Sequence, residues 1–276
     1  MRELSSKVAV VTGAASGIGR ALAVRLAAEG MSLMLADVDP GGLAETAELA
    51  GNGKALTQIT DVSDEASVHH LADRAFGELG AVHVLCNNAG VFQSGHLWTR
   101  TPEDFSWLLG VNLWGVLHGI QAFVPRMIEQ DTEGHIVNTV SVAGLLGAPS
   151  AGGYAVSKYA AFAATQSLAQ DLAAVGSRLR VTALCPGGVR TRINHSEQVR
   201  PAALSIARGS DGLETQDRLD SLVERGIEPE RVAGLVVEAI HEERFLLLTH
   251  PDYGTGLRRQ TDALLTGGIP PLPDYE

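Results

Sequence analysis

The sequence predicts an α/β fold in which helices cover both faces of one seven-stranded, mostly parallel sheet. Short runs rich in Val, Ile and Leu alternate with segments of helical periodicity along the whole chain. The strand-like runs are almost continuously apolar, which is typical of parallel strands buried on both faces. No linker-like segment divides the 276 residues. We therefore interpret residues 1–276 as a single doubly wound domain.

Seven strands and six longer helices follow in order from these patterns. The predicted strands are Lys7–Val11, Ser32–Ala36, Ala55–Ile59, Val82–Cys86, His135–Val140, Leu179–Cys185 and Phe245–Thr249. The predicted helices are Gly17–Glu29, Gly41–Ala50, Glu65–Glu78, Pro102–Glu129, Gly153–Val175 and Pro229–Glu242. Ligands of such sheets bind beyond the carboxyl ends of the strands, so the residues just after each strand are candidates for a site.

Composition and charge exclude several classes of function. The formal charge of −11 disfavours binding to nucleic acid or to an anionic membrane, because both attract basic surfaces. No apolar run approaches the roughly 20 residues of a membrane span, and the first apolar run is too short for a signal peptide. Cys86 and Cys185 follow apolar runs and are expected to be buried free thiols. We expect a cytoplasmic protein that binds a small molecule, and no metal site, because the nine histidines form no ligand pair near acids.

A glycine-rich turn follows the first strand. The segment TGAASGIG, Thr12 to Gly19, places Gly13, Gly17 and Gly19 where the strand passes into a helix, with Ser16 and Ile18 between them. Glycine lets the backbone approach a pyrophosphate closely, and the helix N-terminus offers unpaired amides and partial positive charge. In this strand–turn–helix setting the motif predicts a dinucleotide site.

Asp37 indicates which dinucleotide is bound. It ends the second strand, 18 residues after Gly19, where a carboxylate can accept hydrogen bonds from ribose hydroxyls. The 2′-phosphate of NADP would place further negative charge beside it, at a cost of about 3 kcal/mol or more. NAD is therefore the predicted cofactor. Neither Ser16 nor Val38 offers a compensating cation, but Arg20 is near enough in sequence to leave NADP open.

The third and fourth strands lead to further candidate cofactor contacts. Asp61, followed by Val62, could accept a hydrogen bond from the adenine amino group, or could cap the next helix. In the segment Asn87 to Gly90, the small Ala89 and Gly90 would let the backbone lie against the cofactor, and Asn88 could bond neighbouring loops. For Asn87 a structural role is the expected one.

Three polar residues form the candidate catalytic group. Tyr154 and Lys158 are four residues apart and thus share one helix face, and Ser141 follows the fifth strand at the edge where the cofactor is expected. Oxidation of an alcohol requires a base for its hydroxyl proton. A phenol with a pKa near 10 needs roughly 4 kcal/mol of phenolate stabilisation to reach a pKa of 7, which a neighbouring ammonium and a cationic nicotinamide could supply. Ser141 would hold the substrate oxygen.

The motifs TGAASGIG, NNAG, Ser141, YAVSK and PGGVRT occur in the order typical of short-chain dehydrogenases/reductases, and residues 6 to 195 resemble that family. The resemblance implies a Rossmann-type fold, with Tyr154 as the acid/base and Lys158 binding the nicotinamide ribose and lowering the pKa of the tyrosine. It also implies that Asn112 holds a water in a proton relay. Pro186, Gly187, Val189 and Thr191 would contact the nicotinamide. A homo-oligomer, dimer or tetramer, is implied as well.

The substrate side is less clearly marked. The region of about 190–226 is polar and irregular apart from weakly helical stretches, and we interpret it as a variable segment that covers the substrate. Val142, Leu145 and Leu146 suggest an apolar wall, hence a hydrophobic or aromatic substrate, and the three tryptophans are expected in the core or at an interface. The predicted function is NAD-dependent hydride transfer to or from a secondary alcohol or ketone. The alternatives are an NADP-linked carbonyl or ketoacyl reductase and a dinucleotide sensor without turnover.

Overall fold

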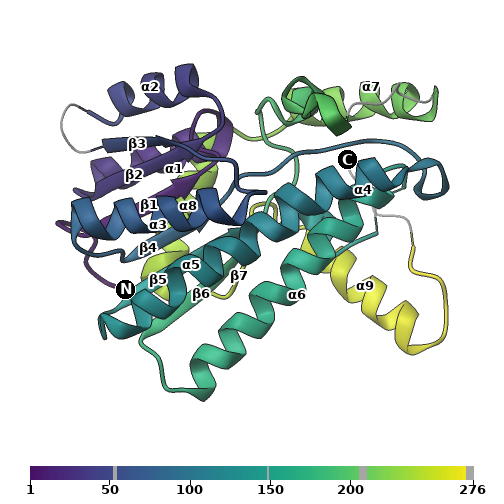
Figure 1. The fold of residues 1–276 in the computed structure, drawn as a ribbon. Coiled ribbons are helices and arrows are strands. Elements are labelled where there is room, and N and C mark those ends of the chain that lie inside the picture. Colours follow the sequence, from purple (N-terminus) through teal and green to yellow (C-terminus); the bar gives the residue numbers. More distant parts are fainter. Residues whose placement is uncertain (52–54, 148, 205–209, 272–276) are drawn as a thin grey trace.

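Seven strands form one parallel sheet in the computed structural model of the chain, which describes residues 1–51, 55–147, 149–204 and 210–271. Their order across the sheet is β3-β2-β1-β4-β5-β6-β7, and neighbouring strands pair in parallel (Figure 1). The strands are β1 (Val8–Thr12), β2 (Ser32–Asp37), β3 (Ala55–Ile59), β4 (Val84–Asn87), β5 (Gly134–Thr139), β6 (Leu179–Cys185) and β7 (Leu246–Leu248). The predicted sheet is confirmed, with strand ends that agree within two residues.

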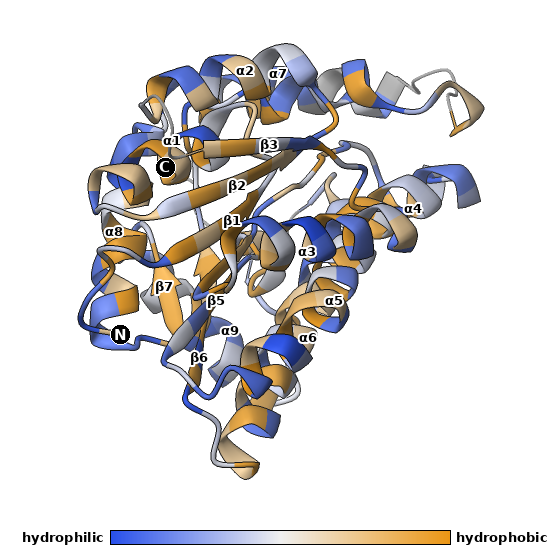
Figure 2. Cartoon of the chain, turned by 60° about the vertical axis from the view of Figure 1, so that its left-hand side comes forward, coloured by the Kyte–Doolittle hydropathy of each residue, from blue (hydrophilic) through white to orange (hydrophobic). Residues whose placement is uncertain are grey.

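Helices cover both faces of this sheet. One face carries α1 (Gly17–Ala28), α2 (Pro40–Leu49) and α8 (Pro229–Glu242), and the other carries α3 (Glu65–Leu79), α5 (Gly115–Glu129) and α6 (Gly152–Ala174). Figure 2 shows the apolar strands between these two helical layers. The remaining helices are α4 (Pro102–Leu109), α7 (Ser210–Glu224), α9 (Tyr253–Leu265) and the short η1 (Leu97–Thr99), η2 (Gly110–Trp114), η3 (Val142–Gly144), η4 (Ile193–Val199) and η5 (Ala202–Leu204).

The two helical layers explain why the strands are apolar throughout. In β1, Ala9 and Val11 pack into the cluster beneath α1 and α8, whereas Val8 and Val10 pack into the cluster beneath α3 and α5. Because successive side chains point to opposite faces and both faces are covered, neither set can be polar.

The segment Pro102–Glu129 is not the single regular helix that its periodicity predicts. A five-residue π-helical turn, η2, separates α4 from α5 and contains Asn112. The Asn112 amide is fully buried and bonds the backbone of Val91, which lies outside the helix. Such π-turns often occur at functional sites. By length and composition Pro102–Glu129 could cross a membrane, but 56% of its apolar window is buried inside the fold, as in a core helix.

The order of the strands determines where a ligand can enter. The chain runs from β1 outward through β2 to β3 and then crosses to β4 on the other side of β1. The crevice above the neighbouring β1 and β4 is the position where doubly wound sheets bind ligands. Beyond β6, η4, η5 and α7 form the described part of the predicted substrate segment, and residues 205–209 of that prediction lie outside the described residues.

Candidate active site

A cavity of about 1160 Å³ lies beyond the carboxyl ends of β1 to β6. It exceeds the roughly 300–1,000 Å³ typical of a pocket for one small ligand, so it has room for a dinucleotide and a second molecule. Most residues predicted from the sequence line it: Gly13, Ser16, Gly17, Ile18, Asp37, Asp61, Val62, Asn88, Ala89, Gly90, Ser141, Tyr154, Lys158, Pro186, Gly187, Val189 and Thr191. Gly19 and Asn112 lie behind its wall.

The glycine-rich turn fits closely against two neighbouring loops. Gly13 and Gly17 have φ angles of 64° and 52°, a backbone conformation that favours glycine. A Cβ on Gly13 would lie 2.7 Å from the Cα of Ala89, and one on Gly17 would lie 2.9 Å from the Cγ2 of Thr191. At Gly19 a Cβ would lie 1.9 Å from the carbonyl oxygen of Gly13. The turn and the N-terminus of α1 thus form a narrow backbone cradle that fits a pyrophosphate.

The Asp37 carboxylate is held in a fixed orientation at the rim of this cradle. Its Oδ2 accepts a hydrogen bond from the amide of Ala15 at 2.9 Å, and its Oδ1 accepts one from the amide of Asp39 at 3.1 Å. Each oxygen keeps a second lone pair for a ligand hydroxyl. These two acceptors therefore fit the two hydroxyl groups of an adenosine ribose.

Two arginines lie near Asp37, and only one of them was considered from the sequence. Arg20 donates to Glu45 at 2.7 Å and to the carbonyl of Ala15 at 2.6 Å, so its charge is already paired. Arg192 lines the cavity, and its Nη2 lies 3.8 Å from the Oδ2 of Asp39. Four strands, β3 to β6, lie between Asp39 and Arg192 in the chain. This separation explains why the sequence alone does not associate Arg192 with the cofactor site.

Asp61 and Asn88 have different local roles. Asp61 accepts hydrogen bonds from the amide and the hydroxyl of Ser63, whereas the cap of α3 is Asp64; the alternative of a helix-capping Asp61 is thus wrong. Asn88 donates to the carbonyl of Thr12 and accepts from the hydroxyl of Thr139. It therefore braces the ends of β1, β4 and β5 around the cavity.

Ser141 reaches the cavity from a strained backbone. Its φ angle is 128°, a region that costs a non-glycine residue about 1–3 kcal/mol. The hydroxyl oxygen accepts from the amide of Ala143 at 3.2 Å and lies 3.5 Å from the carbonyl of Pro186. The side chain of Ser141 also lowers the pKa of Tyr154 through a hydrogen bond. The two hydroxyl groups thus lie together, as the sequence interpretation requires.

Tyr154 and Lys158 occupy the first turns of α6. The Nζ of Lys158 lies 5.7 Å from the centre of the Tyr154 ring and donates to the carbonyl of Thr139 at 2.9 Å. Burial raises the pKa of Tyr154 to about 12, partly opposed by the hydrogen bond with Ser141. Burial also lowers the pKa of Lys158 to about 8. Both groups are thus driven toward their neutral forms, so each would gain from a neighbouring opposite charge.

Asn112 is satisfied by other elements and not by its own helix, the alternative considered above. Its Nδ2 donates to the carbonyl of Val91 and to the hydroxyl of Ser157, each at 2.9 Å. Its Oδ1 accepts from the amide of Val91 at 2.9 Å. Both amide hydrogens are therefore in use, and the side chain ties η2 to α6. A role in a water relay stays a prediction.

The segment after β6 forms a further part of the cavity wall. The carbonyl of Pro186 accepts from the amide of Val142 at 3.0 Å, and the amide of Gly187 donates to the hydroxyl of Thr249. A Cβ on Gly187 would lie 2.6 Å from the ring of Tyr253. The predicted residues Val189 and Thr191 line the same wall.

Several wall residues were not assigned to the site from the sequence. The ring centres of Phe92 and Tyr154 are 4.7 Å apart. Trp107 is buried and packs in one cluster with Tyr154. His250 and Tyr253, after β7, also line the cavity. Val142, Leu145 and Leu146 share one core cluster, but only Val142 of the three also lines the cavity, so the assignment of the two leucines to the wall was wrong. Position after a strand end was the signal available for Phe92 and His250.

The described part of the chain contains no candidate metal site. No three His, Cys, Asp or Glu side chains gather there as a metal would require. Cys86 and Cys185 are buried free thiols.

Comparison with known proteins gives the following similarities. The family model of the short chain dehydrogenases matches residues 7–201. A 1-deoxy-11-beta-hydroxypentalenate dehydrogenase of Streptomyces exfoliatus is 37% identical, over 99% of this chain and 94% of its own length. A CLA biosynthesis dehydrogenase/reductase of Lactiplantibacillus plantarum is 31% identical, over 98% and 97%. The crystal structure of a short chain dehydrogenase/reductase from Burkholderia phymatum in complex with NAD is 42% identical, with a TM-score of 0.96 and 99% of each chain covered.

Proposed function

The chain belongs to the short-chain dehydrogenase family, and on that premise we propose that it transfers hydride between NAD and a secondary alcohol or ketone. The observation that carries the proposal is the meeting of Ser141, Tyr154 and Lys158 in one cavity with the glycine turn and Asp37. This arrangement brings a proton acceptor, its stabilising cation and a dinucleotide cradle within reach of one substrate.

Tyr154 is the acid/base of the proposed reaction. With a pKa of about 12, only about one phenol in 10⁵ is ionised at pH 7. Bound NAD would supply a hydride acceptor whose nicotinamide ring is positively charged before the transfer, and this charge would favour the ionised phenol. The ammonium of Lys158 acts in the same sense. In the direction of ketone reduction, the neutral phenol of Tyr154 is already the form that donates a proton.

Ser141 orients the substrate in this proposal. Its hydroxyl lies with that of Tyr154 and can donate to the oxygen that gains negative charge as the proton leaves. The strained φ angle of Ser141 places the side chain at the cavity wall, between Pro186 and η3. A strained residue that faces the cavity is consistent with a functional position.

NAD is the proposed cofactor because of Asp37. Both carboxylate oxygens are oriented by backbone amides, so the carboxylate could not turn away from a 2′-phosphate without losing them. Arg20 is paired with Glu45 and gives little compensation. Arg192 is the one observation that favours an NADP-linked reductase instead, since its guanidinium lies beside Asp39. It is 65% exposed, where water and salt weaken such an attraction.

The proposed substrate is bulky and apolar. Besides Ser141 and Tyr154, the cavity wall carries the apolar side chains of Val142, Phe92, Trp107, Val199 and Leu204. Such side chains favour a hydrophobic ring or chain over a small polar molecule. The relative named for hydroxypentalenate is consistent with this class.

A fluorescence titration with NADH and NADPH, followed by turnover of a panel of aliphatic, aromatic and polycyclic secondary alcohols, tests the proposal. We expect tighter binding of NADH than of NADPH, and NAD reduction with at least one bulky alcohol. Tighter binding of NADPH would refute the cofactor assignment. Absence of binding to either would refute the proposed function.

A further inference from the structure

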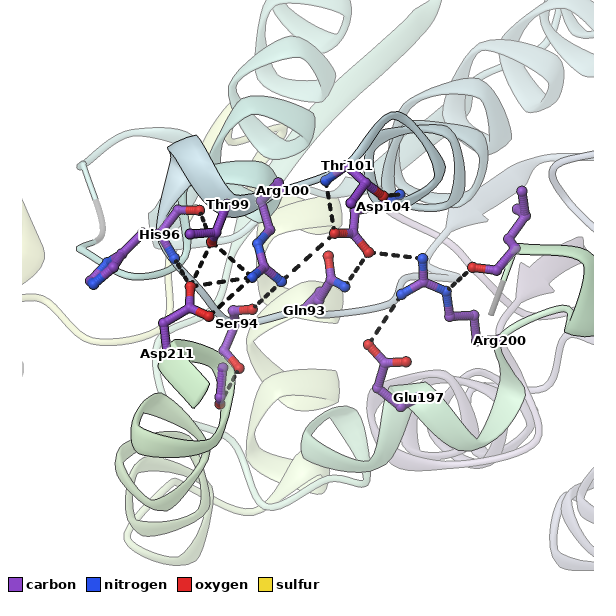
Figure 3. Close-up of polar contacts among 12 residues, drawn as sticks. Gln93, Ser94, His96, Thr99, Arg100, Thr101, Asp104, Glu197, Arg200 and Asp211 are labelled. Atoms are coloured by element: carbon purple, nitrogen blue, oxygen red, sulfur yellow. Dashed lines mark hydrogen bonds and ion pairs between the residues drawn. The ribbon is translucent and has the colours of Figure 1, made fainter. Parts of the chain in front are cut away.

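A buried ion network lies directly behind the wall of the substrate end. Asp104 accepts from Arg200 at 2.8 Å and has Arg100 at 3.8 Å, and Arg100 in turn pairs with Asp211 at 3.2 Å (Figure 3). The side chains of Arg100, Asp104 and Arg200 are only 6%, 1% and 3% exposed. Charges this well shielded from water interact far more strongly than surface pairs.

The network joins parts of the chain that are about 100 residues apart. Arg100 and Asp104 belong to the segment after β4, whereas Arg200 lies after η4 and Asp211 begins α7. Backbone contacts accompany the ion pairs: the amide of His96 donates to Asp211 at 2.8 Å, and Arg200 donates to the carbonyl of Leu204 at 2.7 Å. The network therefore fixes the described substrate segment to the core of the domain.

Each segment presents one set of side chains to the network and another to the cavity. In the segment after β4, Phe92 and Trp107 line the cavity, whereas Arg100 and Asp104 form the network. Between Ile193 and Leu204 the two sets alternate. His195, Val199 and Leu204 line the cavity, whereas Glu197 and Arg200 belong to the network and Asn194 bonds Asp220 of α7.

Arg200 couples the two sets most directly. Its guanidinium lies 4.9 Å from the centre of the Trp107 ring, and Trp107 packs in one cluster with Tyr154 and Leu204. Arg200 thus contacts Trp107, which packs in the same cluster as Tyr154, the proposed acid/base. Within the described residues, Arg200 bonds Asp104, Glu197 and the carbonyl of Leu204, and none of the residues proposed to hold NAD.

We propose that Arg200 and Asp104 are positioning residues that fix the wall of the substrate end and so set the affinity for bulky substrates. The inference rests on the proposed function and deepens it. Loss of Arg200 leaves the buried charge of Asp104 with only the longer contact to Arg100, at 3.8 Å. This favours local opening of the segment around η4 over unfolding of the whole domain. Bulky substrates that touch Phe92, Trp107 or Leu204 would lose contacts, whereas a small alcohol near Tyr154 would not.

The test compares Arg200→Met with Arg126→Met. Arg126 is a matched control, because it also pairs with an aspartate, Asp73 at 2.9 Å, and lies over a phenylalanine ring, but on α5 away from the cavity. For Arg200→Met we expect KM for the best bulky alcohol to rise about tenfold or more, with KM for propan-2-ol and Kd for NADH changed less than about twofold. Arg200→Lys, which keeps the charge but loses the planar stack, should lie between.

Hydrogen exchange of the whole protein supplies a readout that needs no substrate. Peptides covering 193–204 should exchange about tenfold faster in Arg200→Met, with no change in peptides from α1, and Arg126→Met should leave both unchanged. Unchanged exchange at 193–204, or equal losses for bulky and small alcohols, would overturn the proposal. If no alcohol is turned over but exchange rises as expected, the proposed function fails and the positioning role stands.

A separate observation points to a buried water molecule within the network. A cavity of about 10 Å³ adjoins it, and three buried atoms on its lining residues have no hydrogen-bond partner within the described residues: Gln93 Oε1, Arg100 Nε and Asn194 Oδ1. The amide nitrogens of Gln93 and Asn194 are held by Asp104 and Asp220. Both amide oxygens are therefore fixed as acceptors that face away from those carboxylates.

We infer that one water binds here, accepting from Arg100 and donating to Gln93 and Asn194. The volume is about that of one water, and two acceptors with one donor match its hydrogen-bonding capacity. A high-resolution crystal structure should show a density peak within hydrogen-bond distance of all three atoms. Empty density, or direct bonds among the three side chains, would contradict the inference.

Discussion

The Nζ of Lys158 lies 5.7 Å from the centre of the Tyr154 ring, and burial shifts the pKa of both groups toward the neutral form. At Tyr154 the hydrogen bond with Ser141 only partly opposes burial, and Lys158 donates to the uncharged carbonyl of Thr139. At pH 7 the buried ammonium of Lys158 is therefore costly to the fold. This cost is offset when Tyr154 ionises, since the two opposite charges attract each other.

Lys158→Met should therefore stabilise the protein while it abolishes turnover. The pKa of Lys158 in the folded protein, about 8, lies below the ordinary lysine pKa of 10.5, so burial of the charge destabilises the fold at pH 7. This cost is fully present below pH 8 and is relieved as pH rises toward 10.5. We expect the variant to be about 2 kcal/mol more stable than the wild type at pH 7, with a smaller difference at pH 10. Urea unfolding at both pH values measures this; a variant that is less stable at pH 7 would contradict it.

Ser141→Gly should be more stable than Ser141→Ala. At a φ angle of 128° alanine keeps the strain of a Cβ, whereas glycine relieves it, so we expect a difference of about 1 kcal/mol. The usual order is the reverse, and Ala163→Gly in the middle of α6 should cost about 1 kcal/mol. Both Ser141 variants should lose about 100-fold or more in kcat. Chemical unfolding compares the three stabilities, and equal stability of the two Ser141 variants would argue against strain.

Asp37→Ala should narrow the preference for NAD over NADP by about 100-fold, because the repulsion of the 2′-phosphate is removed. Asp39→Ser is the control, since Ser can still cap α2 while the charge next to Arg192 is lost. It should leave the preference within a few fold. The ratio of kcat/KM for the two cofactors is the measurement. If Asp39→Ser changes the cofactor preference strongly and Asp37→Ala changes it little, Arg192 and not Asp37 determines the preference.

Local patterns were enough to predict the sheet and a set of candidate site residues, most of which line the cavity. The strands could be predicted because both faces of the sheet are buried, so each strand is a short apolar run. The turn at Gly13 and the pair Tyr154–Lys158 could be predicted because each depends only on residues that are close in sequence. The π-turn at Asn112 could not be predicted, because it depends on a partner, Val91, from another segment. For the same reason the pairing of Asp104 with Arg200 is invisible in the sequence. Leu145 and Leu146 could not be told from Val142, because apolar character alone does not say which side of a loop faces a cavity.

The most direct test of the account is hydride transfer from a secondary alcohol carrying deuterium on its carbinol carbon. Wild-type protein, NAD and the labelled bulky alcohol should yield NADH that contains the deuterium by mass spectrometry, whereas Tyr154→Phe should yield almost none while it binds NADH with a similar Kd. Deuterated NADH formed by Tyr154→Phe at a rate near that of the wild type would contradict the assignment of Tyr154. Absence of labelled NADH with the wild type, across the panel of alcohols, would contradict the proposed reaction itself.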